Sequence, residues 1–341
     1  MPVRYPRPYT MGAAMGPDLV SVLEAAYAVD RPEREWLQGL IDAIRPSVDA
    51  GLGIAAYVYD TNDRPFRVKS LLVDGCPVDE AGIAMLNHES NDSFVRDSWI
   101  ARSAMMASET PGYANHPGVR GVLHPAGIRD IMVVNAIDPI GVGCWIGAPL
   151  PQLSTLEGTE RERWNRVAAH LRSSLRLRLR LAARETSEEV GPAEAEAILT
   201  PAGKVEHLER AAEPERDALR DAALGIVRAR TEYRSEPERS LPSWKAMVRA
   251  RWTLVDEFRR DGEHYIVARV NAMTTKPMSR LSERERQVVA CLSMGQTNKE
   301  AAYELGLSHS TVRVLVARAF AKLGVDTRAA LVAKYRQDSL T

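Results

Sequence analysis

The chain has 341 residues and a formal net charge of zero, and 45% of its residues are hydrophobic while 26% are charged. A chain of this length and composition forms two or three globular domains, which excludes a disordered polypeptide. It contains no apolar run of about 18 residues and no signal peptide, so we expect a cytoplasmic protein without a membrane partner.

The first 16 residues contain three prolines and two glycines and show little periodicity, so we expect residues 1–16 to form a flexible tail. Apolar residues then recur at helical spacing, which predicts helices over 18–28 and 33–44. Pro46 should end the second helix, because the residue before a proline is driven out of the helical region.

After residue 50 the pattern changes to short apolar runs divided by turn-forming residues. Residues 53–59 and 66–73 are predicted to form two strands of a hairpin or meander. Residues 108–127 are rich in Gly, Pro and His and are predicted to be a loop. Further helices are expected over 79–86 and 92–106, and further strands over 128–135 and 141–148.

A long helix is predicted over 160–183, where apolar residues form a stripe at helical spacing. Its second half carries five arginines between leucines. They could form a basic patch for nucleic acid, but a solvated face on a connecting or dimer-forming helix is the interpretation we favour. His170, on the same helix, is predicted to lie at the surface. The five arginines are Arg172, Arg176, Arg178, Arg180 and Arg184.

Residues 17–184 therefore contain helices, two strands, helices, two strands and a long final helix. This order resembles a GAF-type sensory domain. The resemblance implies a sheet that encloses a small apolar ligand, although core packing is the favoured role for each aromatic or soft residue that could line such a pocket. The candidates for the pocket are Tyr57, Tyr59, Trp99, Met105 and Trp145.

A polar, acidic stretch over 185–193 is predicted to be a linker to a second unit over 194–273. The Asp-Gly pair at 261–262 suits the tight turn of a hairpin. The order of elements is similar to a PAS-like domain, with an annex packed on the first domain as the alternative. The predicted elements are strands over 195–199 and 204–208, a helix over 213–231, and hairpin strands over 252–258 and 264–271.

The carboxy-terminal end is basic relative to the rest, because residues 278–341 carry a net charge of +4 and the preceding residues −4. Two capping boxes mark helix starts in it, at 282–285 (Ser-Glu-Arg-Glu) and 297–300 (Thr-Asn-Lys-Glu). A turn containing Gly306 separates two short capped helices. This is the helix-turn-helix arrangement.

The stretch 281–332 is similar to the LuxR-type helix-turn-helix family. The resemblance covers the last sixth of the chain and implies a module of four helices over 279–336. It also implies binding to double-stranded DNA, with the third helix in the major groove. The matching elements are Leu281-Ser-x-Arg-Glu-x-Gln-Val, Gly295, Asn298-Lys-Glu-x-Ala, Leu307-Ser, Thr311-Val-Arg and Lys322-Leu-Gly-Val-x-x-Arg.

The same resemblance assigns roles to individual residues. Lys299, Ser308 and Thr311 match phosphate-contacting positions, and a helix N-terminus favours phosphate. Arg313 matches the basic residue nearest the bases, where arginine can pair with guanine; a phosphate contact without base readout is the alternative. Val314 could touch a thymine methyl, although packing is favoured. The candidate DNA-binding residues are Lys299, Ser308, His309, Ser310, Thr311, Arg313, Val314, Arg318 and Lys322.

Members of this family bind pseudo-palindromic sites as homodimers, often through the fourth helix, so the resemblance implies a homodimer. Arg328, Leu331 and Tyr335 are the candidate dimer contacts, and the 160–183 helix is the second candidate. The overall plan is also similar to that of quorum-sensing regulators with an acyl-lactone-binding domain. The Trp-x-x-x-Tyr pocket pattern of those regulators is not evident in this sequence.

Signatures of an enzyme are missing. The glycines at 141–147 lack the lysine of a phosphate loop, so a tight strand edge is favoured there, and no Gly-x-Ser-x-Gly motif occurs. Neither the histidines nor the cysteines have metal-site spacing, so we expect no catalytic residue, metal or cofactor. These histidines and cysteines are His88, His116, His124, Cys76, Cys144 and Cys291.

The sequence thus predicts an α+β sensory region, GAF-like and then PAS-like, followed by an all-α LuxR-type helix-turn-helix domain. The expected function is sequence-specific transcriptional regulation in response to a small ligand or a partner. The alternative is the same DNA-binding regulator with a body that serves only protein interaction or dimerisation. The two differ in whether the body contains a pocket.

Overall fold

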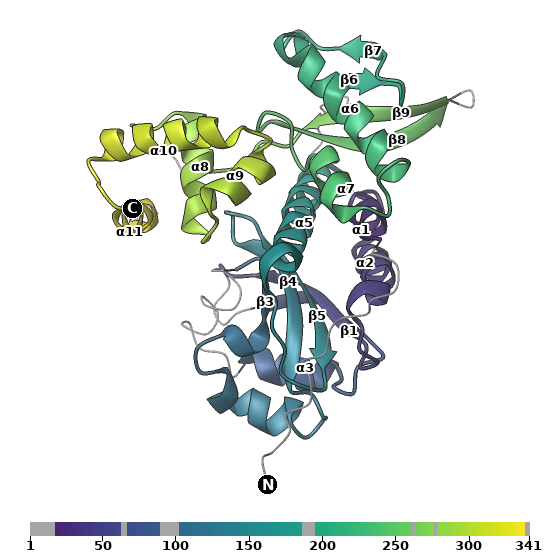
Figure 1. The fold of residues 1–341 in the computed structure, drawn as a ribbon, viewed down its shortest axis with the longest axis vertical. Coiled ribbons are helices and arrows are strands. Elements are labelled where there is room, and N and C mark those ends of the chain that lie inside the picture. The colour runs from purple at the N-terminus through teal and green to yellow at the C-terminus, as the bar shows by residue number, and fades with distance from the viewer. Residues whose placement is uncertain are drawn as a thin grey trace.

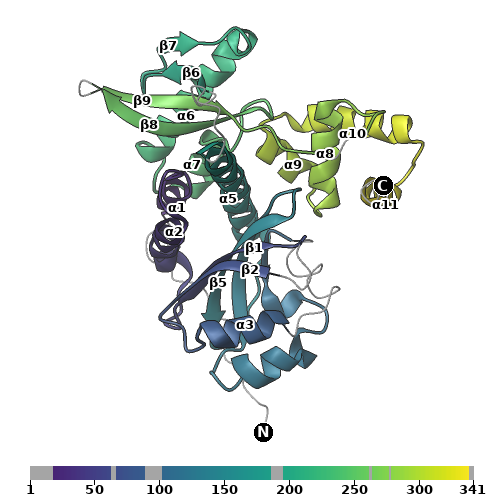
Figure 2. The ribbon, with the colours of Figure 1, turned by 180° about the vertical axis from the view of Figure 1, so that it is seen from behind.

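The computed structural model describes residues 18–62, 67–88, 102–185, 195–260, 263–275 and 278–337. Within that part, two antiparallel sheets lie toward opposite ends of a long helix, α5 (Gly158–Glu185), and the C-terminal helices lie to one side (Figures 1 and 2). The predicted tail, nearly all of the predicted linker and the Asp-Gly turn at 261–262 fall outside the described residues.

Two N-terminal helices, α1 (Leu19–Ala26) and α2 (Glu33–Val48), follow the predicted apolar stripes, and their apolar side chains are buried in the core. Trp36 joins the two, because its indole N–H donates to the carbonyl of Ala26 at 2.9 Å. Full burial of an aromatic side chain of this size contributes roughly 2–3 kcal/mol.

The prediction that Pro46 ends α2 was wrong, since the helix runs on to Val48. Pro46 lies in the last turn, where its missing N–H costs the helix a single hydrogen bond. The turn still closes, because the Asp49 N–H donates to the carbonyl of Arg45 at 3.0 Å.

The first sheet has the strand order β2-β1-β5-β4-β3, and every neighbouring pair is antiparallel. Helices α1, α2 and α5 pack on one face, and α3 (Glu80–His88) lies toward the other. Because β5 lies in the middle of this sheet, the expectation of a strand edge at 141–147 was wrong. The strands are β1 (Ile54–Asp60), β2 (Arg67–Asp74), β3 (Ala104–Met106), β4 (Asp130–Ile137) and β5 (Val142–Leu150).

Two predictions in the middle of this region differ from the structure. The described end of the helix predicted over 92–106 is the strand β3, which pairs with β4. The loop predicted over 108–127 contains short helical turns that pack over the sheet. These turns are Ala107–Glu109, Tyr113–Asn115 and Val119–Leu123.

The second sheet has the order β7-β6-β9-β8 and packs against α6 (Arg216–Arg230). A single apolar core runs from α1 and α2 through α5 into α6 and this sheet. The body therefore packs as one unit around α5. Its remaining elements are β6 (Ala195–Leu199), β7 (Val205–Leu208), a turn at Glu213–Glu215, α7 (Pro237–Ser243), β8 (Trp252–Arg260) and β9 (Glu263–Val270).

The C-terminal helices have a core that is largely their own, built from side chains such as Val288, Leu292, Val312 and Leu323. Among the described residues, none of the helices combines the length and apolar character needed to cross a bilayer. The helices are α8 (Glu283–Ser293), α9 (Asn298–Leu305), α10 (His309–Leu323) and α11 (Arg328–Gln337).

Candidate nucleic-acid interface and ligand pocket

The start of α9 is held by the capping box that the sequence predicted. The Thr297 hydroxyl accepts from the Glu300 N–H at 3.2 Å, and the Glu300 carboxylate accepts from the Thr297 N–H at 2.7 Å. Gly306 ends the helix with φ of +61°, a left-handed conformation that favours glycine. These local bonds fix the position of α9 relative to the turn that follows it.

Helix α10 begins at Ser308, whose hydroxyl accepts from the Thr311 N–H at 3.0 Å. The helix buries one stripe in the domain core, including Val312, Leu315 and Ala319. The opposite stripe faces solvent, and Val314 there is 49% exposed. Of the candidate DNA-binding residues on or capping α10, the exposed ones are Ser308, His309, Ser310, Thr311, Arg313, Val314, Arg318 and Lys322.

Two candidate lysines form ion pairs. The Lys322 ammonium lies 2.7 Å from the buried carboxylate of Glu285, which also receives the Ser282 N–H. Burial raises the pKa of Glu285, but the bonds from Lys322 and Ser282 outweigh it and lower that pKa below its ordinary value. Lys322 thus braces α10 against α8, while Lys299 pairs with Glu162 of α5 at 2.8 Å.

Helix α11 presents less of the proposed dimer surface than the sequence suggested. Leu331 and Tyr335 are buried in the core of the C-terminal helices, so neither offers its side chain to a second copy in this structure. They face inward because they lie four positions apart, on the stripe that packs against α8. Arg328 is exposed but donates to the carbonyl of Gln296.

Residues 279–334 match the model of the family described as "Bacterial regulatory proteins, luxR family". This part of the chain is a LuxR-family helix-turn-helix domain. The match confirms the resemblance drawn from the sequence motifs. It covers α8, α9, α10 and most of α11.

Three curated proteins are similar to this chain, and two of them over short stretches. The "HTH-type transcriptional activator RamA" of Corynebacterium glutamicum is 38% identical over 73 residues, which are 21% of this chain and 26% of that protein. The "Transcriptional regulatory protein FixJ" of Azorhizobium caulinodans is 48% identical over 48 residues, 14% of this chain and 23% of that protein.

A longer match is the "Probable transcriptional regulatory protein SgaR" of Hyphomicrobium methylovorum, 33% identical over 127 residues, 37% of this chain and 52% of that protein. The chain therefore spans about half or less of the length of these relatives. A solved structure, "SdiA in complex with octanoyl-rac-glycerol", aligns with 84% of this chain and 80% of that chain at 11% identity. Its TM-score of 0.21 is too low to support an argument.

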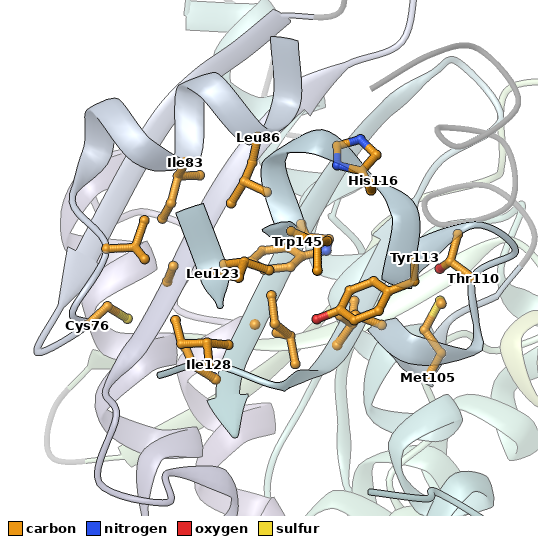
Figure 3. A pocket seen from close by; sticks show the side chains of 18 of the residues that line it. Cys76, Ile83, Leu86, Met105, Thr110, Tyr113, His116, Leu123, Ile128 and Trp145 are labelled. Atoms are coloured by element: carbon orange, nitrogen blue, oxygen red, sulfur yellow. The ribbon is translucent and has the colours of Figure 1, made fainter. Parts of the chain in front are cut away.

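The body contains a pocket between the first sheet and the turns that cover it, with a cavity volume of about 100 Å³ (Figure 3). Trp145 lies at its centre, and its ring stacks on that of Tyr57 with 4.8 Å between centroids. Met105 lines the pocket from β3. Three of the five candidate pocket residues thus meet in one cavity.

The other two candidates are placed differently. Tyr59 does not line the pocket, because its ring packs beside Ile137 and its hydroxyl donates to Asn135 at 2.8 Å. Trp99 lies outside the described residues. The sequence analysis missed the covering residues, among them Leu86, Tyr113 and Leu123, since their region was predicted to be a loop.

The glycines of β5 make room for the aromatic rings of this face. A Cβ on Gly147 would lie 1.9 Å from the Trp145 ring, and a Cβ on Gly143 would lie 2.3 Å from the Tyr59 ring. Their alternation along the strand was the signal for this packing in the sequence, because every second residue of a strand points to the same face.

The largest departure from the predictions is on α5. Arg172 and Arg176 were expected on a solvated face, but both are buried at the contact with the LuxR-type domain. Arg172 donates to the buried carboxylate of Glu304 at 2.9 Å, and Arg176 to that of Asp138 at 2.5 Å. Since buried charges are found almost only in pairs, the four groups compensate one another.

His170 was predicted to be a surface residue, and it is fully buried. Its ring nitrogens lie 3.0 Å from the Tyr27 hydroxyl and 2.9 Å from the Tyr303 hydroxyl, so it joins α1, α5 and α9. Burial lowers the pKa of His170 to about 3. The ring is therefore neutral at physiological pH.

Proposed function

We propose that this chain is a sequence-specific, DNA-binding transcriptional regulator whose body responds to a small, neutral, apolar molecule. The observation that carries DNA binding is the exposed stripe of α10 on a domain that matches the LuxR family. The names of the relatives, which are transcriptional regulators, support the same function.

The exposed stripe has the chemistry of a helix that reads the major groove. The N-terminus of α10 and the hydroxyls of Ser308 and Thr311 suit phosphate oxygens. Arg313 suits the O6 and N7 acceptors of guanine, and the exposed Val314 suits a thymine methyl. Lys299, at the start of α9, provides a further phosphate contact.

We propose that two copies bind a pseudo-palindromic site, because a two-fold dimer presents two recognition helices about one helical turn of DNA apart. Within the described part of α11, the exposed residues nearest the predicted contact are Arg328 and Ala333. A dimer contact on α11 would use these, with α5 as the second candidate.

The pocket supports a small-molecule signal over a body that serves protein interaction alone. Its lining is apolar apart from groups such as Thr110, Tyr113 and His116, and no acidic, lysine or arginine side chain is among the lining residues. An apolar cavity of about 150 Å³ binds benzene in another protein. The pocket here is of the same order, so a neutral ligand of one ring or a short chain fits it.

The test of DNA binding is genome-wide footprinting and duplex titration of wild type and Arg313→Ala. We expect discrete palindromic sites for the wild type and a loss of about 5- to 150-fold in affinity for the variant, since one bidentate base contact is worth about 1–3 kcal/mol. Arg220→Ala, at an exposed arginine of α6, is the control for loss of one positive charge. Equal binding by both variants would contradict the role of Arg313, and no discrete wild-type sites would contradict the function.

A further inference from the structure

The LuxR-type domain is docked on the body through one face of α5. Residues of α5 spaced by three or four positions meet α9 in turn: Glu162 pairs with Lys299 at 2.8 Å, and Asn165 donates to Glu300 at 2.6 Å. Further along, His170 and Arg172 meet Tyr303 and Glu304. Helix α9 thus lies along several turns of α5.

This contact engages the end of α9 that the proposed function assigns to DNA. The carboxylate of Glu162 is an oxyanion at hydrogen-bond distance from the Lys299 ammonium, which is the geometry that a phosphate oxygen would adopt. At 2.8 Å no phosphate fits between the two groups. A phosphate contact by Lys299 therefore requires Glu162 to move away.

The cleft beside this pair shows the same competition. It has a volume of about 620 Å³, and Thr297, Lys299 and His309 line it from the LuxR-type domain. Glu162 and Asn165 of α5 line the opposite side. A DNA backbone that ran past the starts of α9 and α10 would have to occupy this cleft, which α5 closes on one side.

The chemistry of the interface suits a contact that opens. Four buried charged side chains carry much of it, and buried ion pairs add little net stability because desolvation offsets their attraction. The apolar side chains that line the cleft on the two helices, Ala169 and Ala302, are small. Separation would return the charges to water at a modest loss of apolar burial. The four charged residues are Asp138, Arg172, Arg176 and Glu304.

We propose that the α5–α9 contact is an autoinhibitory latch, in which Glu162 holds Lys299 in the place of a DNA phosphate. This inference rests on the proposed DNA-binding function. In the latched state α10 remains exposed, but the phosphate-contacting start of α9 is occupied by the body. DNA binding at full strength requires α9 to leave α5.

Two full-length variants open the latch through opposite changes of charge. Glu162→Gln removes the competing carboxylate, and Asn165→Asp sets a second carboxylate against Glu300. Glu206→Gln and Asn115→Asp are matched controls at exposed positions away from the contact. The probe is a labelled duplex of about 30 base pairs, long enough for two half-sites. Far-UV circular dichroism checks that each variant is folded.

We expect Glu162→Gln to bind the duplex about 2- to 5-fold more tightly than Glu206→Gln, as for the loss of one exposed ion pair. Asn165→Asp should also bind more tightly than wild type, although its added negative charge alone would weaken binding. In a Lys299→Gln background the gain from Glu162→Gln should vanish. The slope of log affinity against log salt should steepen by about 0.9 when Lys299 is freed.

The outcomes separate the latch from the function on which it rests. If wild type binds the duplex and Arg313→Ala weakens it, but Glu162→Gln and Asn165→Asp match their controls, the latch is wrong and the function stands. If Glu162→Gln gains as much without Lys299 as with it, phosphate competition is wrong. If neither wild type nor the opened variants bind any duplex, the proposed function fails and the latch with it.

Discussion

Individual side chains at the junction of α1, α5 and α9 have environments that their sequence neighbours do not reveal. His170 lies among arginines in the sequence, yet its ring is enclosed by Tyr27, Trp244 and Tyr303. Each tyrosine hydroxyl also has a backbone acceptor, the carbonyl of Ala246 or Leu241. The ring is therefore held as a neutral bridge, because burial disfavours its charged form.

This burial predicts an acid-sensitive fold. The unfolded chain protonates His170 below about pH 6.5, whereas its pKa in the folded protein is about 3. The unfolded state then binds more protons between these values, so stability falls as the pH falls, by about 1.4 kcal/mol per unit from this group. His170→Gln should flatten the pH dependence in urea titrations, and His207→Gln, at an exposed histidine, should not. Parallel curves for His170→Gln and wild type would contradict the buried neutral ring.

At the scale of elements, the turn between α9 and α10 is held by the body as well as by its own glycine. A Cβ on Gly306 would lie 2.0 Å from the carbonyl oxygen of Met247. The neighbouring residues Arg249 and Ala250 both have φ of +50°, and the Ala250 N–H donates to the carbonyl of Leu305 at 2.6 Å. A strained backbone of this kind persists only where its surroundings hold it.

Two glycines with the same backbone conformation separate the docking of the domain from its folding. Gly306 and Gly324 have φ of +61° and +63°, but a Cβ on Gly324 meets nothing within 4 Å. Gly324→Ala should cost about 1–2 kcal/mol of stability from left-handed strain alone. Gly306→Ala should cost more and raise hydrogen exchange at 247–251, because the turn must move off the body. Equal effects of the two variants would show that the Met247 contact does not constrain the turn.

At the scale of the whole molecule, the pocket and the LuxR-type domain touch the same sheet. Tyr57 stacks on Trp145 in the pocket and packs beside Tyr59, which belongs to a cluster that includes Met294 of the C-terminal domain. Arg172, which pairs with Glu304, also donates to Ser103 beside β3. A ligand that shifts this sheet therefore acts directly on the residues that hold α9.

Neutral one-ring probes such as benzene, toluene and indole test this arrangement. At about 100 times its Kd a ligand adds about 2.7 kcal/mol, which raises the Tm of a unit of this size by roughly 5–10 °C. Ala55→Leu fills the pocket and should abolish the shift, whereas Ala114→Leu, at an exposed turn, should not. A bound probe should also change duplex affinity. Shifts that persist in Ala55→Leu, or no shift with any neutral probe, would favour a body that serves protein interaction.

The sequence by itself determined the LuxR-type domain almost residue by residue. Its helix starts depend on hydrogen bonds between a hydroxyl and a backbone N–H three residues away, as at Ser282, Thr297 and Ser308. Its stops depend on single glycines. Such bonds join near neighbours in the chain, so residue types at fixed spacing are sufficient to predict them.

Only the tertiary structure decided which side chains of the body meet. Arg172 and Glu304 are 132 positions apart, and no local pattern distinguishes an arginine that pairs with a buried glutamate from one that faces water. The same holds for the strand β3, which exists because β4 supplies its hydrogen-bond partners, and for the pocket, which needs the sheet and its covering turns together. Contacts between distant segments, rather than local propensity, fix these features.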